Sequence, residues 1–179
     1  MSAFGALSPE VELIVDKTWD GLPAEPGEVA LVTLKSVDRG WEVSVDAPFH
    51  DDPAPPGPSA TTEGLWEHEV VELFVAGPNE RYLEVELGPH GHWLVLELDG
   101  VRTRRGQPAP ISYDASIDGA RWRGTARFAR SLIPPGPHRM NAYAMHGVDP
   151  RRYLAHSPVP GDRPDFHRLE RFVAVDLGS

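Results

Sequence analysis

The alternation of apolar and acidic residues in the middle of this chain constrains its fold more than any other sequence feature. In residues 82–87, a leucine or valine occupies every second position, and Glu84 and Glu86 occupy positions between them. Successive side chains of a β-strand point to opposite faces of the sheet. The pattern therefore predicts a strand with one apolar and one acidic face, and the segment before it places Glu72 in the same way.

An alternation of period two recurs along nearly the whole chain, and no segment shows a strong helical period. The predicted strands are rich in valine, leucine and aromatic residues. They are Val11–Thr18, Val29–Val37, Trp41–Ala47, Trp66–Ala76, Arg81–Leu87, His92–Leu98, Ile111–Ile117, Trp122–Phe128, Met140–His146 and Arg171–Leu177. Short strands separated by turn residues at this spacing predict an all-β fold, a mostly antiparallel β-sandwich of about ten strands.

The length of 179 residues and the hydrophobic content of 40% suit a single domain over residues 1–179. Two proline-rich segments interrupt the strands. Residues 48–64 predict a long surface loop. Residues 156–168 are predicted to cross from one sheet to the other.

The composition excludes several classes of function. With 27 acidic and 17 basic residues the net charge is -10, which argues against nucleic acid or an anionic membrane as a partner. The chain has no cysteine, so disulfides, thiolate metal sites and cysteine nucleophiles are excluded. The first residues lack the pattern of a secretory signal and no apolar run is long enough to span a bilayer, which predicts a cytoplasmic protein.

Three successive antiparallel strands should gather polar and aromatic side chains on one sheet face. We expect this acidic face to hold Glu72, Tyr82, Glu84, Glu86, Trp93 and Glu97. The opposite face should form core, with Val71, Leu73, Val75, Leu83, Val85, Leu87, Leu94, Leu96 and Leu98.

The acidic face has two interpretations. In the first it is an ordinary solvated surface, on which arginines such as Arg102 and Arg104 pair with the carboxylates. In the second it is a shallow site for a polyol or a cation, with Trp93 or Tyr82 as a stacking platform and carboxylates that accept hydrogen bonds from hydroxyl groups. Tryptophans that begin predicted strands, such as Trp66, are expected to pack at the open end of the sandwich.

Eight histidines are scattered along the chain, and His90, His146 and His167 are the best candidates for ligand contacts. No HExxH zinc motif, GxSxG nucleophile motif or glycine-rich phosphate loop occurs. We therefore predict no catalytic residue and no cofactor, and leave open whether a metal ion binds.

Several motifs in order along the chain resemble an uncharacterised protein family of bacteria and animals. They are TWDG (18–21), LWEHEVVELF (65–74), YLEVELGPHG (82–91), MHG (145–147) and PDFH (164–167). More distantly, the acidic strands and the closing Phe166, His167, Glu170 and Phe172 are similar to the family-nine carbohydrate-binding module and its DOMON-like relatives. That resemblance implies a β-sandwich, used in relatives to bind sugars or haem.

These observations predict a non-catalytic β-sandwich that binds a small polar ligand, with carbohydrate as the leading class. One alternative is an enzyme, metal-assisted or not, that acts through Glu72, Glu84, His90 and His167. Another is a protein-interaction module that uses the loop at residues 48–64. Convergence of the four side chains in one concave pocket would favour the enzyme, whereas a flat acidic face would favour binding or a scaffold role.

Overall fold

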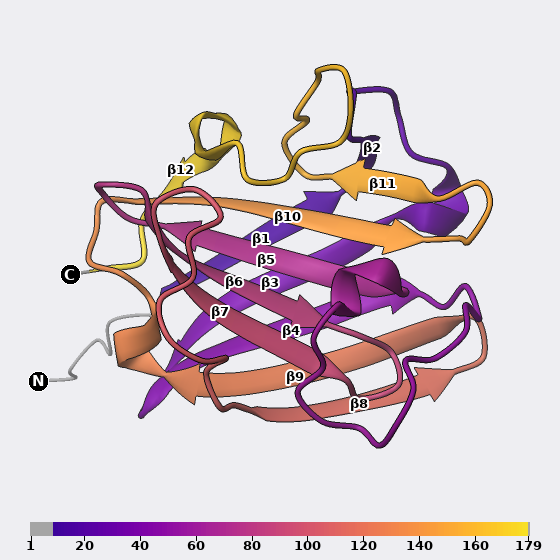
Figure 1. Cartoon of the computed structure of the whole chain (residues 1–179), viewed down its shortest axis with the longest axis horizontal. Coiled ribbons are helices and arrows are strands. Elements are labelled where there is room, and N and C mark those ends of the chain that lie inside the picture. The colour runs from indigo at the N-terminus through magenta and orange to yellow at the C-terminus, as the bar shows by residue number, and fades with distance from the viewer. Residues whose placement is uncertain (1–8, 179) are drawn as a thin grey trace, which may run out of the picture.

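The computed structural model describes residues 9–178 and is an all-β sandwich, with 7% of the chain helical and 48% in strands. Two antiparallel sheets lie one behind the other (Figure 1). The first sheet has the strand order β1-β3-β4-β9-β8. Its strands are β1 (Glu10–Val15), β3 (Ala30–Val37), β4 (Gly40–Pro48), β8 (Ser112–Asp118) and β9 (Arg121–Ala129). The predicted fold class is confirmed.

The second sheet has the order β2-β11-β10-β5-β6-β7, and β12 pairs with the first residues of β10, whereas β11 pairs with its last residues. Its strands are β2 (Lys17–Thr18), β5 (Val70–Ala76), β6 (Arg81–Leu87), β7 (Trp93–Asp99), β10 (His138–His146), β11 (Arg152–Ala155) and β12 (Val173–Val175). Four single-turn 3-10 helices complete the elements: η1 (Pro26–Glu28), η2 (Leu65–Glu67), η3 (Arg130–Leu132) and η4 (Leu169–Arg171). Within residues 9–178, no helix has the length and apolar character that a bilayer crossing requires.

The main core fills the space between the two sheets. Alternate residues of β4, such as Val43 and Val45, face alternate residues of β5 and β6, such as Leu73 and Val85, and all four are buried. This is the burial that strict alternation predicts for the facing sides of a sandwich.

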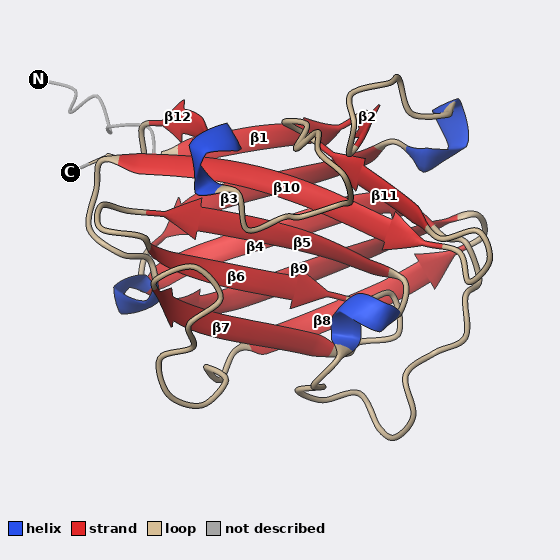
Figure 2. Ribbon diagram, turned by 45° about the horizontal axis from the view of Figure 1, so that its top comes forward, coloured by secondary structure: helices blue, strands red, loops and turns tan. Residues whose placement is uncertain are grey.

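A second apolar cluster lies on the outer face of the second sheet, where the first interpretation of the sequence expected solvent. The segment between β11 and β12 (residues 156–172, hereafter the covering segment) folds over this face together with η2 (Figure 2). Its Phe166, Leu169 and Phe172 pack with Phe74 and Tyr82 of the sheet. The acidic face is therefore buried, and the prediction of a solvated sheet surface is wrong.

Specific hydrogen bonds attach the covering segment to β10. The fully buried Asn141 of β10 donates from Nδ2 to the carbonyl of Ser157 at 2.8 Å and accepts the Ser157 N–H at 2.9 Å. The Tyr143 hydroxyl donates to the carbonyl of Phe166 at 3.0 Å, and the two rings stack with centroids 3.9 Å apart. The expectation that residues 156–168 cross between sheets is wrong, because the segment begins and ends beside β10 of one sheet.

The orientation predicted for β7 is also wrong by one residue. Register pairs Leu94 with Glu86 and Leu96 with Glu84, so both leucines share the acidic face. Trp93 pairs with Leu87 and packs against the main core instead. Both faces of β7 carry apolar residues because both are covered, so alternation alone could not distinguish them.

Several strands differ from the sequence-based expectation. The predicted strand Val11–Thr18 is divided at Asp16, where the chain passes from the first sheet to the second. Trp66 lies in η2 rather than at the start of β5. Strand β11 was not predicted at all, because it has only four residues.

A buried ion pair anchors η1 to the edge of the second sheet. Glu28 accepts two hydrogen bonds from Arg152, at 2.6 and 2.8 Å, and its Oε1 lies 3.0 Å from His146 Nε2. The His146 ring stacks on His50 with a centroid separation of 3.5 Å. The hydrogen bonds from Arg152 lower the pKa of Glu28 to about 2.

We predict that Val85→Asp prevents folding. Val85 is fully buried in the main core, and an unpaired carboxylate there has no compensating partner. The matched control is Val148→Asp, since Val148 is 75% exposed. Circular dichroism and urea denaturation should show an unfolded first variant and a control that matches wild type. Equal denaturation midpoints for all three proteins would refute the register of β6.

We predict that the stabilisation by Glu28 depends on pH. Its folded pKa lies below its unfolded value of 4.5, so its contribution is complete above pH 4.5 and is lost as the pH falls toward 2. Glu28→Gln should lower the free energy of unfolding by roughly 2 kcal/mol at pH 7 and by about half as much at pH 3. Urea denaturation at both pH values measures this, with Glu10→Gln as the exposed control. A loss of equal size at the two pH values would contradict the assignment.

Candidate functional site

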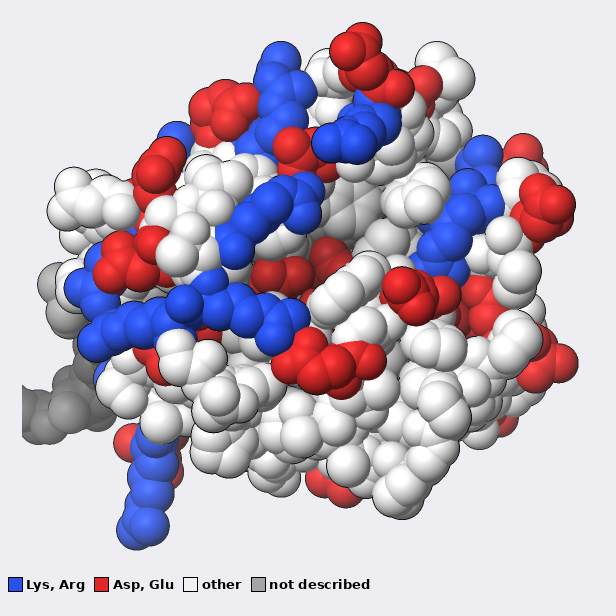
Figure 3. All heavy atoms as spheres, in the orientation of Figure 1, with Lys and Arg blue, Asp and Glu red and all other residues white. Residues whose placement is uncertain are grey.

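A cavity of about 270 Å³ opens between the outer face of the second sheet and the segments that cover it. Figure 3 shows a hollow on this side of the molecule, with acidic atoms at its floor and basic side chains around its rim. The residues that line it come from β5, β6, β7, β10, β11, η2, the covering segment and the loop after β7. They are Trp66, Glu72, Glu84, Leu96, Leu98, Arg102, Arg104, Met145, Tyr153, Pro164, Phe166 and His167.

Glu72 and Glu84 form the floor of the cavity, and Glu86 lies next to them. Glu72 of β5 pairs in register with Glu86 of β6, and Glu84 lies two residues before Glu86 on the same face. Their side chains are almost fully buried, with exposed fractions of 2% for Glu72, 5% for Glu84 and 0% for Glu86. One carboxylate oxygen of each residue lies within 4.8 Å of the other two. The strand register therefore concentrates three acidic groups in one buried place.

Burial perturbs the protonation of these carboxyl groups. Desolvation raises the pKa of Glu84 to about 7. It also raises the pKa of Glu72 and of Glu86 well above the usual range, and the neighbouring carboxylates raise both further. The cluster consequently retains protons at neutral pH, so it can donate hydrogen bonds to a ligand as well as accept them.

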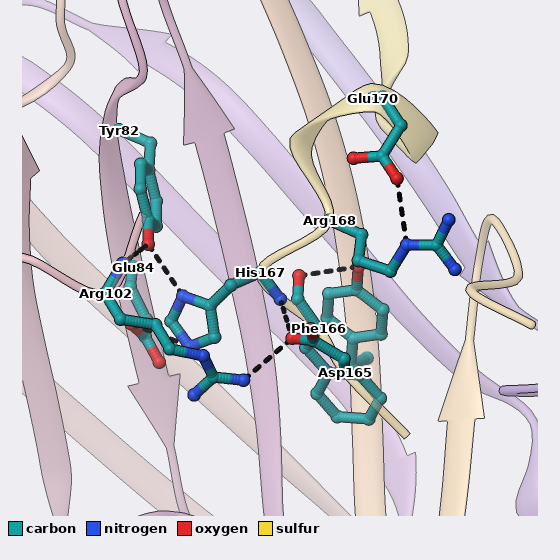
Figure 4. A network of polar contacts seen from close by, with 9 residues as sticks. Tyr82, Glu84, Arg102, Asp165, Phe166, His167, Arg168 and Glu170 are labelled. Carbon is teal, nitrogen blue, oxygen red and sulfur yellow. Dashed lines mark hydrogen bonds and ion pairs between the residues drawn. The ribbon is translucent and has the colours of Figure 1, made fainter. Parts of the chain in front are cut away.

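His167 and Glu84, which both line the cavity, belong with Tyr82 to one network of polar contacts (Figure 4). The Tyr82 hydroxyl oxygen accepts the Arg102 backbone N–H at 2.9 Å and lies 2.7 Å from His167 Nδ1. When the phenol donates its proton to Nδ1, the neutral imidazole carries its own proton on Nε2. That nitrogen lies 4.0 Å from Glu84 Oε2. Burial lowers the pKa of His167 to about 4, so the ring is neutral at physiological pH.

Two arginines stand at the rim, and each has an acidic partner. Arg102 donates from Nη2 to Asp165 Oδ1 at 2.7 Å, which links the loop after β7 to the covering segment. Arg104 binds Glu63 through two hydrogen bonds of 2.8 and 2.9 Å. These pairs close the cavity on two sides and leave donors near its mouth.

Aromatic rings complete the walls. Trp66 in η2 is 40% exposed and lines the cavity, with Tyr153 and Phe166 among the other lining residues. The expectation that Trp66 fills the open end of the sandwich is wrong. An exposed indole beside buried carboxylates is the combination of surfaces that a polyhydroxylated ring can use.

The structure brings together only part of the predicted site. Four of the eight predicted ligand residues, Glu72, Glu84, Tyr82 and His167, line the cavity or contact a residue that does, and Glu86 lies directly behind its floor. Three others lie elsewhere. Trp93 faces the main core, His90 contacts Phe49 edge-on, and His146 binds Glu28 at the edge of the sheet.

The sequence analysis missed several cavity residues. Trp66, Tyr153 and Phe166 were not chosen as ligand contacts, and Arg102 and Arg104 appeared there only as partners for surface carboxylates. Phe166 could have been found from its place in the Pro164–His167 motif. The arginines lie in a loop whose path no alternation pattern encodes.

The structure does not bring His90 and His167, which the enzyme alternative names, together as ligands of one ion. Among residues 9–178, the one group of three or more acidic or histidine side chains close enough to share an ion consists of Glu72, Glu84 and Glu86. No imidazole belongs to it. The chemistry of this group is therefore that of oxygen ligands alone.

Comparison with solved structures relates the fold to carbohydrate-binding proteins. A proposed carbohydrate-binding protein of Bacteroides uniformis superposes with a TM-score of 0.71 at 18% identity, over 91% of this chain and 84% of that one. A family-nine carbohydrate-binding module of Caldicellulosiruptor kristjanssonii in complex with cellotriose gives a TM-score of 0.53 at 13% identity, over 82% and 72% of the two chains. At these identities the similarity establishes the fold.

Sequence relatives are closer. The UPF0462 protein C4orf33 homolog of Mus musculus is 42% identical over 175 residues, covering 92% of this chain and 91% of the mouse protein. The human UPF0462 protein C4orf33 is also 42% identical, with 92% and 87% covered, and the Danio rerio homolog is 40% identical, with 94% and 90% covered. No family model matches the chain. Because these relatives are at least 40% identical over more than nine tenths of this chain, the chain belongs to the UPF0462 (C4orf33) family.

Proposed function

We propose that the cavity binds a small polyhydroxylated ligand, a single sugar ring or the end of a sugar chain, without converting it. The observation that carries this proposal is the exposed Trp66 at the mouth of a cavity whose floor holds the buried carboxyl groups of Glu72 and Glu84. A sugar ring has an apolar face for an indole and hydroxyl groups for carboxylates.

The size and polarity of the cavity support this ligand class. Its volume of about 270 Å³ lies just below the roughly 300–1,000 Å³ of pockets for drug-sized ligands, which suits one ring better than several. The walls combine apolar side chains such as Leu96 and Leu98 with a few charged groups. Sites of this composition gain affinity from apolar contact and specificity from the polar groups.

The structural neighbours support the same class. The module from Caldicellulosiruptor kristjanssonii has been solved with cellotriose and with glucose, so the fold accommodates sugar sites in that protein. Transfer of sugar binding to the present chain is our proposal, because a shared fold does not by itself define a ligand.

We predict that Trp66→Ala weakens binding of a sugar ligand roughly tenfold, because the change removes the stacking surface without opening the core. Isothermal titration calorimetry with glucose, xylose and cellotriose measures the affinity, and circular dichroism verifies the fold. The control is Trp93→Phe, which changes a tryptophan on the opposite face of the sheet and should leave affinity unchanged. Absence of binding by wild type to a broad monosaccharide panel would overturn the proposed class, and equal affinities for wild type and Trp66→Ala would overturn the site.

A catalytic role is the second candidate, favoured by one observation. Glu72, Glu84 and His167, three of the four residues named for an enzyme, converge in a concave pocket, whereas His90 does not. A carboxyl group and an imidazole N–H facing one ligand could move protons between its oxygens. Proton magnetic resonance of the exchange between glucose anomers tests this. If the anomers exchange no faster with the protein than in buffer, the catalytic role is excluded for glucose and only the binding role remains.

A further inference from the structure

We infer that Glu72, Glu84 and Glu86 form a binding site for one divalent cation, calcium above all, at the floor of the cavity. This site shares Glu72 and Glu84 with the proposed sugar site, but it does not involve Trp66 and does not require a sugar.

The first support is that Glu86 has no other partner. Both of its carboxylate oxygens are fully buried without a hydrogen-bond partner in the described part of the chain. An ionised carboxylate that is buried without donors is strongly unfavourable, so these groups hold protons unless a cation replaces them. Its oxygens lie beside those of Glu72 and Glu84, so a cation held among the three would satisfy groups that the protein itself leaves unpaired.

The surrounding basic groups do not fill this role. Arg102 and Arg104 have their guanidinium groups bound to Asp165 and Glu63 at the rim. His167 Nε2 is 4.0 Å from Glu84 Oε2, which is too long for a hydrogen bond. Outside the cluster, no side chain of residues 9–178 donates a hydrogen bond to Glu86. Its polar neighbours are the carboxyl groups of Glu72 and Glu84, so the cluster lacks a bound counter-charge.

The ligand set indicates which cations fit. Three carboxylates without imidazole or thiolate favour hard ions such as Ca²⁺, Mg²⁺ and Mn²⁺ over zinc. Opposite ligands across a calcium ion are separated by roughly 5 Å, twice a bond of about 2.4 Å. The three oxygens all lie within 4.8 Å of one another, so one calcium ion can span them. Magnesium usually keeps several waters and is held by one or two carboxylates, so three carboxylates in one place favour calcium.

A cation at this site would be reachable from the cavity, and the three glutamates would not fill its coordination shell. Glu72 and Glu84 line the cavity, so an ion bound between them has coordination positions open toward it. Calcium takes about six to eight oxygen ligands, and three glutamates supply at most six oxygens. Water or the hydroxyl groups of a ligand would complete the shell.

The test uses the whole protein, first treated with chelator and then titrated with CaCl₂, and separately with MgCl₂, in the absence of sugar. Calorimetry should give about one calcium per chain, which separates the site from weak binding to a surface of net charge -10. Calcium at about a hundred times its dissociation constant should raise the melting temperature by roughly 5–10 °C, and chelator should reverse the rise.

Two matched variants locate the ion. Glu86→Gln keeps the size of the side chain and should lose most of the calcium-induced shift, whereas Glu97→Gln on the opposite face of the same sheet should retain it. Trp66→Ala should retain it as well, so failure of the sugar proposal and failure of the cation proposal are distinguishable.

If Glu86→Gln does not fold, wild type still decides the question. No saturable binding of calcium, magnesium or manganese at up to about 10 mM, above the range of the weakest protein calcium sites, would overturn the inference, and the carboxyl groups would then be paired by protons alone. Binding that Glu86→Gln preserves would overturn the location.

Discussion

Strands β5 and β6 are buried on both faces, and the rest of the structure depends on this constraint. Their inner faces complete the main core against the first sheet, whereas their outer faces lie beneath the covering segment and η2. In an antiparallel sandwich the outer face is commonly solvated. Here every acidic residue that the alternation places outward, from Glu72 to Glu86, enters a second apolar layer instead.

The cost of burying three carboxyl groups is not offset within the protein. Glu28 provides the contrast in the same molecule. Two hydrogen bonds from Arg152 offset the desolvation of its carboxylate and lower its pKa to about 2. Glu72 and Glu86 receive no such bonds, and burial moves the pKa of each in the opposite direction. A group that opposes folding and lies at a cavity is a reasonable candidate for function, since strained or unsatisfied groups concentrate at functional sites.

The sequence predicted the sandwich and the membership of the acidic face on β5 and β6, because strict alternation fixes which side chains share a face. It failed on β7, whose leucines and whose Trp93 are all apolar, so that neither face was marked as core. The sequence could not predict that the covering segment packs on the outer face of the second sheet. The hydrogen bonds between Asn141 and Ser157 join residues that lie 16 positions apart in the chain. Ser157 belongs to a segment without regular alternation, and no local pattern encodes such a contact.

The floor of the cavity is built from paired strands, whereas its upper walls are built from irregular segments, and this difference affects ligand specificity. The carboxyl groups of Glu72 and Glu84 are fixed by paired strands, and moving them would shift the register of the whole sheet. Trp66, Arg102 and Phe166 instead stand on η2, on the loop after β7 and on the covering segment. Substitutions in such irregular segments change fewer backbone pairings than substitutions in strands. The floor therefore defines what chemistry the cavity offers, and the cover can change which molecule fits above it without altering the fold.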